Sequence, residues 1–423
     1  MGASDSPTAR PAARLATGLD PDCLVFSCAE TAAGAQASFP GAADLYGAML
    51  SRVCPRTRAV ATLFPAYSYR RPAPRRLTGP DGPGLRALAD WFGELDETYR
   101  RFPPTVLCET TDLRLGGNVL HYRENGAVRV LYETHRLSDL KMIEAIGLDG
   151  DRVDEHLAAD GLYFLLCSVG SFNYGHWLVD DLPRLEGFFV LRRLHPGRTI
   201  TILLPAYGAH MDEVRRRMIA LYLGADEGWR AVFYDRERVY AVPRLYFATP
   251  CSQQPYGKSP EAVAAVRTRL LRQTRVARAE SALRRITSPG SGRRLFVDRS
   301  GARGRTLVNR SDVVSAVERR GFEVIDPERY SPRQQIVKFA RARVVVGLAG
   351  AAMVNTIFCP PQARILYIAP DRGWTDPFFW DLAAVCGHPY AAVHGRWSDR
   401  EDTIARRDFS LSVPDLEAAL DAL

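Results

Sequence analysis

The chain has 423 residues, of which 46% are hydrophobic, 25% charged and 10% aromatic, close to the average for soluble globular proteins. Disorder of the whole chain is therefore excluded, and the length predicts two domains with a sizeable core. Basic residues exceed acidic ones by 56 − 48 = +8, and all but Lys141, Lys258 and Lys338 are arginines. The arginines are spread without a basic block, which indicates a GC-rich bacterial coding sequence rather than a nucleic-acid-binding protein.

Two features of the sequence bear on the cellular location of the protein, the N-terminus and the cysteines. Residues 1–20 lack the apolar core of about 7 to 15 residues that a secretory signal needs, so we expect a disordered tail. No apolar run approaches the ~20 residues of a membrane-spanning helix. The eight cysteines form no CxxC pair, which fits a reducing compartment. We predict a cytoplasmic protein without a transmembrane segment, and peripheral contact with the inner membrane stays open.

Residues 21–255 are predicted to form an N-terminal α/β domain. Two β-rich runs over 118–135 are joined by Asn125-Gly126, the strongest short signal for a β-hairpin. Buried strands are expected at 161–169 and 201–207, then one or two over 239–250. Helices are expected between them at 176–194, with an interruption at Pro183, and at 210–224. This alternation predicts βαβ units around a parallel sheet.

Residues 256–290 are predicted as a linker helix, with Ser259 as N-cap and Pro260 at the first helical position. Residues 291–423 then alternate again between strand and helix, which predicts a Rossmann-like C-terminal domain. The predicted fold class is α/β, with two Rossmann-like domains that face each other across a cleft. The ligand is expected in that cleft.

Three segments carry a family resemblance: SFNYGHWLVDDLPRL at 171–185, FVDRSGARGRTLVNRSDV at 296–313, and PERYSPRQQIVKFARARVVVGLAGAAMVN at 327–355. In order and spacing they resemble the three signature blocks of glycosyltransferase family 61, which includes many bacterial capsular polysaccharide proteins. The resemblance implies a GT-B architecture, an inverting reaction and a nucleotide-sugar donor. We therefore expect transfer to a capsular, exopolysaccharide or lipid-linked glycan, with neither a cofactor nor a metal.

In the first block, His176 and Asp180 are four residues apart and share one helix face. Such a pair suits the removal of a proton from an acceptor hydroxyl. The family match makes Asp180 the candidate base, and His176 then orients it, is the base itself, or binds the acceptor. A merely capping pair or a metal-binding pair remains open, although no third ligand stands nearby. Trp177 is expected in the core and Asp181 on the solvated face.

The second block places Arg299, Arg303 and Arg305 in a Gly-containing loop after a strand. Fixed guanidinium groups stabilise the charge that develops on a leaving nucleoside diphosphate. The resemblance makes Arg299 and Arg305 phosphate-binding residues, with Arg303 beside them. A solvated loop in an arginine-rich protein is the alternative.

The third block is a strand that runs into a small-residue turn and a helix N-terminus, where backbone amides can meet a phosphate. Gly350, Ala351 and Asn355 match the family, as does Gln335 upstream, so all four are assigned to the donor site. The family pattern is Gly-x-His-Gly-Ala, and Ala349 stands where the histidine is usual.

This departure leaves a second function open, a non-catalytic protein that binds a glycan or a nucleotide on the glycosyltransferase fold. An NAD-dependent oxidoreductase is disfavoured because the G-x-G-x-x-G fingerprint is missing. His388 and His394 are expected at the surface or in turns, and Cys359 and Cys386 in the interior. No Ser/His/Asp or Cys/His nucleophile grouping can be assembled, which disfavours a covalent hydrolase.

Overall fold

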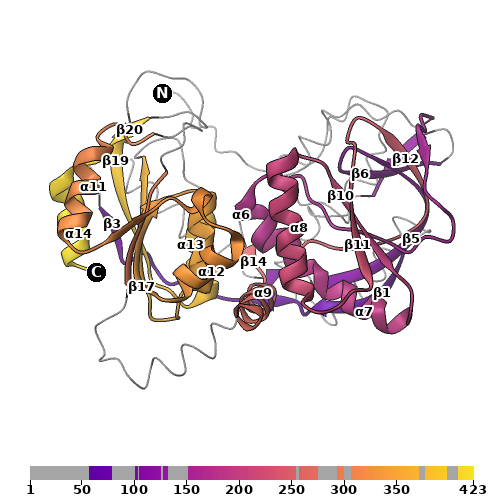
Figure 1. Cartoon of the computed structure of the whole chain (residues 1–423), viewed down its shortest axis with the longest axis horizontal. Coiled ribbons are helices and arrows are strands. Elements are labelled where there is room, and N and C mark those ends of the chain that lie inside the picture. Colours follow the sequence, from indigo (N-terminus) through magenta and orange to yellow (C-terminus); the bar gives the residue numbers. More distant parts are fainter. Residues whose placement is uncertain are drawn as a thin grey trace, which may run out of the picture.

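The computed structural model describes residues 57–78, 101–102, 104–124, 127–131, 151–253, 257–274, 293–299, 306–370, 377–397 and 408–423. It shows a mixed α/β protein, as the sequence predicts, in which two sheets lie side by side along the long axis of the molecule (Figure 1). The predicted tail at 1–20, the turn Asn125-Gly126 and the second half of the predicted helix at 259–285 lie outside these ranges.

The first sheet has nine strands in the described ranges, with the order β11-β10-β9-β12-β5-β6-β7, and β1 pairs with β5 and β8 with β12. Strands β9 to β12 are mutually parallel where they pair, as the strand–helix alternation predicts. Strand β12 then runs antiparallel to β5, so the sheet is mixed and only half of it is Rossmann-like. The predicted hairpin is confirmed, since β6 pairs antiparallel with β7 from Glu124 opposite Ala127. The strands are β1 Thr57–Phe64, β5 Thr105–Gly116, β6 Val119–Glu124, β7 Ala127–Val130, β8 Glu155–His156, β9 Tyr163–Leu165, β10 Ile200–Pro205, β11 Trp229–Tyr234 and β12 Val239–Ala248.

The second sheet has the order β16-β15-β17-β18-β19-β20. Its first five strands are parallel, and β17 and β18 are buried along most of their length because helices cover both faces. Strand β3 comes from the N-terminal part of the chain and pairs with β19, so the predicted domain 21–255 also contributes to this sheet. The strands are β3 Arg76–Thr78, β15 Arg293–Val297, β16 Glu323–Ile325, β17 Ala342–Leu348, β18 Arg364–Pro370, β19 Tyr390–Trp397 and β20 Phe409–Ser410.

Helices begin where the sequence supplies caps. The Ser259 side chain accepts a bond from Ala262 N at the start of α9, and Ser331 forms a capping box with Gln334 at the start of α12. Two short ribbons, β2 Tyr67–Ser68 with β4 Arg101–Phe102 and β13 Ser252–Gln253 with β14 Gly257–Lys258, complete the strands. The helices are α6 Tyr174–His176, η3 Trp177–Asp181, η4 Leu182–Leu185, α7 Glu186–Leu194, α8 Ala209–Leu223, α9 Pro260–Gln273, α11 Arg310–Arg319, η5 Pro327–Arg329, α12 Pro332–Ala340, η6 Ala351–Phe358, α13 Phe378–Cys386 and α14 Val413–Asp421.

One apolar core runs through both halves of the molecule. Its buried members include Phe164 and Ile202 of the first sheet, Val266 of α9, and Val345 and Ile365 of the second sheet. Figure 1 shows α9 between the two sheets, together with α6, α8, α12 and α13. The halves are therefore joined by packed helices as well as by the chain.

A buried ionic cluster adds a polar connection between the halves. Asp381 of α13 is fully buried and accepts bonds from Arg71 Nε at 3.0 Å and from Lys258 Nζ at 3.2 Å. Tyr69 also donates to this carboxylate. Since breaking one arm of a buried ion pair leaves a charge uncompensated, the cluster strongly favours this arrangement of the three segments once they are together.

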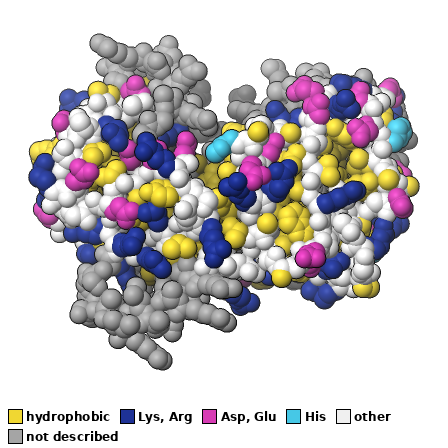
Figure 2. All heavy atoms as spheres, in the orientation of Figure 1, with side chains coloured by type: hydrophobic (Ala, Val, Ile, Leu, Met, Phe, Trp, Pro, Cys, Tyr) yellow, Lys and Arg dark blue, Asp and Glu magenta, His cyan; other side chains and the backbone are white. Residues whose placement is uncertain are grey.

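The surface agrees with the spread of arginines along the sequence. Figure 2 shows Lys and Arg side chains scattered among Asp and Glu over the visible face, not gathered in one patch. No helix in the described part of the chain is both long and apolar enough to cross a bilayer.

Two histidines that were expected at the surface are buried: His388 is 3% exposed and His394 4%. The expectation of exposure was wrong because His388 lies in the buried turn between α13 and β19, and His394 lies within β19 itself. His388 Nε2 lies 2.9 Å from Pro360 O, so this nitrogen donates to the carbonyl. Burial lowers the pKa of His388 from 6.5 to about 4.

This shift predicts a pH-dependent stability. The unfolded chain takes up a proton below about pH 6.5 that the folded chain does not take up until about pH 4. The free energy of unfolding should therefore fall as the pH drops through this window, with His388 contributing up to about 3 kcal/mol. His388→Gln keeps a donor for Pro360 and should remove this part of the pH dependence in urea titrations. Exposed His156→Gln is the matched control, and equal slopes for the two variants would contradict the assignment.

Candidate functional site

The first block folds into a helix whose geometry changes every few residues. The Asn173 side chain caps α6 by accepting from Gly175 N at 2.8 Å. The chain then forms the π-helical turn η3, the 3₁₀ turn η4 and the α-helix α7. Pro183 cannot donate a backbone hydrogen bond, which interrupts the ladder at the predicted place. Single π turns of this kind are frequent at functional sites.

His176 and Asp180 contact each other as the four-residue spacing predicts. The His176 Nδ1 atom lies 2.9 Å from Asp180 Oδ2. The Asp180 side chain is fully buried, whereas that of His176 is 25% exposed. The second carboxylate oxygen, Oδ1, accepts from Ser252 Oγ at 2.6 Å. The pair is therefore a partly exposed imidazole held by a carboxylate that solvent does not reach.

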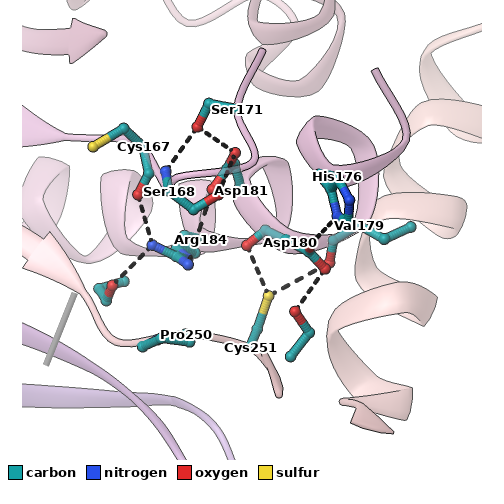
Figure 3. Close-up of polar contacts among 12 residues, drawn as sticks. Cys167, Ser168, Ser171, His176, Val179, Asp180, Asp181, Arg184, Pro250 and Cys251 are labelled. Atoms are coloured by element: carbon teal, nitrogen blue, oxygen red, sulfur yellow. Dashed lines mark hydrogen bonds and ion pairs between the residues drawn. The ribbon is translucent and has the colours of Figure 1, made fainter. Parts of the chain in front are cut away.

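Asp181 is fully buried and does not lie on a solvated face. Its Oδ2 accepts from Ser171 Oγ at 2.7 Å and from Ser168 Oγ at 3.2 Å, and Arg184 Nη2 lies 3.9 Å from Oδ1. Figure 3 shows the two neighbouring carboxylates turned away from each other, Asp180 toward His176 and Asp181 toward Ser171. The expectation failed because a π turn holds more residues than an α turn and brings both side chains inside.

Cys251 supports the π turn from the opposite side (Figure 3). Its Sγ lies 3.1 Å from Asp180 O and 3.5 Å from Val179 O. Burial raises the pKa of the Cys251 thiol to about 12, so the group stays protonated and donates to these carbonyls. Trp177, predicted for the core, is fully buried in the same turn.

The second and third blocks meet at the carboxyl edge of the second sheet. Arg299 and Gly350 each follow by two residues the ends of β15 and β17, which are neighbouring parallel strands. A Cβ built on Gly350 would lie 3.4 Å from Arg299 Nη1. With the order β16-β15-β17-β18, this edge is where the winding direction of the sheet changes, the usual ligand site of such sheets. Arg303 and Arg305 lie outside the described residues.

Gln335 and Asn355 are also brought together, but they bond to the protein. Asn355 Nδ2 donates to Gln335 Oε1 at 2.9 Å and to Ala352 O, and its Oδ1 accepts from Tyr174 Oη at 2.8 Å. Gln335 Nε2 donates to Pro327 O and Tyr330 O. All amide hydrogens of the two side chains are thus engaged inside the protein. These bonds join α6 to η6 and α12, and the role of the pair in the donor site stays a prediction.

The first and third blocks touch directly. A Cβ on Gly175 would lie 2.8 Å from Val354 Cγ2 and 3.4 Å from the Cα of Ala351, so α6 packs on η6 at the distance that a glycine allows. Ala351 is the first residue of η6, directly after Gly350. On another side of the imidazole, the ring of Phe378 meets His176 edge to face, with 5.5 Å between the centroids. The three blocks therefore converge, with His176 on one half and Arg299 with Gly350 on the other.

Two other observations bear on the chemistry. A hollow of about 390 Å³ over β10, β11 and β12 is lined by Leu203, Asp235 and Tyr240, among others, and by no residue of the three blocks. Across the described ranges, no group of three or more His, Cys, Asp or Glu side chains is placed to hold a metal ion. Among the described residues, the predicted site residues His176 and Arg299 thus lie on opposite halves.

Comparison with known proteins agrees with the three blocks. Residues 174–366 match the family model described as Glycosyltransferase 61, which confirms the resemblance stated from the sequence. No curated protein matches the chain. The matched region contains His176, Asp180, Ser252, Arg299 and Gly350.

The contact between α6 and η6 predicts different effects on stability for alanine substitutions at two glycines. Gly175→Ala forces its methyl group to 2.8 Å from Val354 and should lower the free energy of unfolding by about 1 to 3 kcal/mol. Gly350→Ala meets no atom closer than 3.4 Å, and its φ of 176° is open to any residue, so stability should change by less than about 0.5 kcal/mol. Chemical denaturation of both variants measures the difference. Equal stabilities would show that α6 does not rest on η6 in this way.

Proposed function

The chain belongs to glycosyltransferase family 61, and from this premise we propose that it moves a sugar from a nucleotide-sugar donor to a glycan hydroxyl, with inversion at the anomeric carbon. The observation that carries the mechanism is the partly exposed His176, held by buried Asp180 on the half opposite Arg299 and Gly350. A base and an anion-binding group on facing elements are what such a transfer requires.

We assign the role of base to His176. Asp180 was the candidate from the family match, but a fully buried carboxylate with both oxygens bonded does not reach an acceptor. The ionised carboxylate accepts a hydrogen bond from Nδ1–H, so the proton of the neutral imidazole is on Nδ1 and the lone pair is on Nε2. As the acceptor oxygen bonds to the anomeric carbon, its proton moves to Nε2 and the bond to the diphosphate breaks on the opposite side. Asp180 then stabilises the imidazolium, as the buried carboxylate does in a catalytic triad.

The nucleoside diphosphate of the donor is assigned to the edge formed by Arg299 and Gly350. The leaving group becomes more negative as the glycosidic bond breaks, and a guanidinium already in place stabilises that charge without reorganising. Gly350 has no side chain, so a phosphate held by Arg299 can approach the backbone there more closely than at any other residue type. In this proposal the two halves act as the donor and acceptor sides of a GT-B enzyme, without a metal. The proposed acceptor is a capsular, exopolysaccharide or lipid-linked glycan. The proposed location of the reaction is the cytoplasm or the inner membrane.

Ala349 favours a second candidate function, a glycan- or nucleotide-binding protein without catalysis. Its side chain is 7% exposed and packs in the shared apolar core, so this position offers no imidazole to the donor. A panel of nucleotide sugars in a thermal-shift assay identifies the donor, because a bound ligand raises the unfolding temperature. Release of nucleoside diphosphate from that donor then supports transfer. A clear thermal shift with no release by the wild-type chain, under any acceptor tried, would favour the binding protein.

Arg299 should matter for the phosphates of the donor. Arg299→Ala should lower the affinity for a nucleoside diphosphate by about ten-fold or more, because charge-assisted bonds to phosphate are lost. The affinity for the free nucleoside should stay unchanged. Calorimetric titration of both ligands measures this. Arg343→Ala is the matched control. Arg343 is exposed and lies near the start of β17, at the opposite edge of the same sheet. Equal weakening of nucleoside and diphosphate by Arg299→Ala would remove the assignment.

His176 and Asp180 should matter for turnover and not for donor binding. His176→Ala should lower kcat by roughly 10² to 10⁴, the usual effect of removing a positioned base. Asp180→Asn should cause a smaller loss, because the imidazole remains but its orientation is less well defined. The donor Kd should stay at the wild-type value in both variants, each shown to be folded by circular dichroism. A larger loss for Asp180→Asn than for His176→Ala would return the role of base to the carboxylate.

A further inference from the structure

We infer that Ser252 is a positioning residue for His176, which it controls through the carboxylate of Asp180. The inference rests on the proposed role of His176 as base. Ser252 lies 72 residues after Asp180 in the chain, in a short ribbon that no sequence pattern singled out. It does not touch the imidazole, so its effect must pass through the carboxylate.

The contacts that support this form a line of two short hydrogen bonds. Ser252 Oγ donates to Asp180 Oδ1 at 2.6 Å, and His176 Nδ1 donates to Asp180 Oδ2 at 2.9 Å. Ser252 is 1% exposed and Asp180 is fully buried, so water does not replace the hydroxyl. With one oxygen held, rotation of the carboxylate is restricted, and the other oxygen stays where Nδ1 meets it. The hydroxyl therefore helps to fix the orientation of the imidazole ring.

The ribbon that carries Ser252 also supports the other neighbour of the imidazole. Ser252 of β13 is paired with Lys258 of β14. Lys258 is fully buried, with Nζ 3.2 Å from Asp381 Oδ2 and 3.8 Å from the centre of the Phe378 ring. Phe378 in turn meets His176 edge to face. One ribbon thus supports both groups that orient the ring, and the buried ion pair keeps the ribbon in place.

Ser252 is not a nucleophile in this arrangement. Its hydroxyl donates to the carboxylate and not to the imidazole, so no base takes its proton, and its burial keeps it from a substrate. The order serine, aspartate, histidine makes the carboxylate the central member. A covalent glycosyl-serine step therefore forms no part of the inference.

Ser171 provides a matched control. It is also a fully buried serine, and its hydroxyl donates at 2.7 Å to the carboxylate of Asp181, the neighbour of Asp180 in the same π turn. The Asp181 carboxylate faces Ser171 and Ser168, away from His176 (Figure 3). Ser171→Ala and Ser252→Ala thus remove the same group at the same depth, and only Ser252→Ala breaks a contact that leads to the imidazole.

The test is the tautomer of His176, measured by ¹⁵N NMR on the full chain labelled at histidine, with the signal assigned from its loss in His176→Gln. In the wild type we expect a proton on Nδ1 and a bare Nε2. In Ser252→Ala we expect a mixture in which Nε2 carries the proton in a substantial fraction. Ser252→Thr keeps the hydroxyl and should restore the wild-type signal, and Ser171→Ala should leave it unchanged. Ser252→Cys, with a weaker donor, serves if the alanine variant does not fold.

Kinetics give a second measurement that a merely structural role would not produce. Release of nucleoside diphosphate from the nucleotide sugar with the largest thermal shift should fall about ten-fold or more in Ser252→Ala, with the donor Kd unchanged. A wild-type tautomer and a wild-type rate in Ser252→Ala would overturn the inference and leave the proposed function standing. An unchanged rate in His176→Ala would instead refute the proposed base, whatever the tautomer of the Ser252 variants.

Discussion

The close packing of α6 on η6 is the contact on which the rest of the site depends. Gly175 has no side chain, so the helix that carries His176 comes within van der Waals distance of Ala351 and Val354. Tyr174 fixes the same approach by donating to Asn355, which is fully buried in η6. The proposed base on α6 and the proposed phosphate-binding edge of the second sheet are thereby held at a set separation. Without this contact, the two groups would belong to separate halves with no common substrate.

The two buried carboxylates of the π turn are both stabilised by hydrogen bonds, but their bonds have different roles. Two adjacent carboxylates enter the interior, and each is provided with hydroxyl donors, because an unpaired buried charge would be too costly. Asp181 uses its bonds with Ser168 and Ser171 to hold the loop before α6. Asp180 accepts one bond from Ser252 at Oδ1 and contacts His176 through Oδ2. The same chemistry thus serves folding at one residue and ring orientation at the next.

Sequence patterns predicted what depends on neighbours along the chain. Buried runs gave β10 and β17, and the four-residue spacing gave the contact of His176 with Asp180. The burial of Asp181 was missed because α-helical periodicity does not describe a π turn. Ser252 was missed because serine is common and its partner lies far away in the chain. The antiparallel pairing of β5 with β1 and with β12 was missed, because pairing between distant strands leaves little trace in local alternation.

The distribution of charge between the halves has a consequence for the proposed mechanism. The core position Ala349 supplies no imidazole, so in this mechanism the phosphates meet the guanidinium of Arg299 and backbone groups near Gly350. A guanidinium binds an anion through its permanent charge, whereas an imidazole can take up and release a proton. Donor binding and proton removal therefore depend on groups of different kinds.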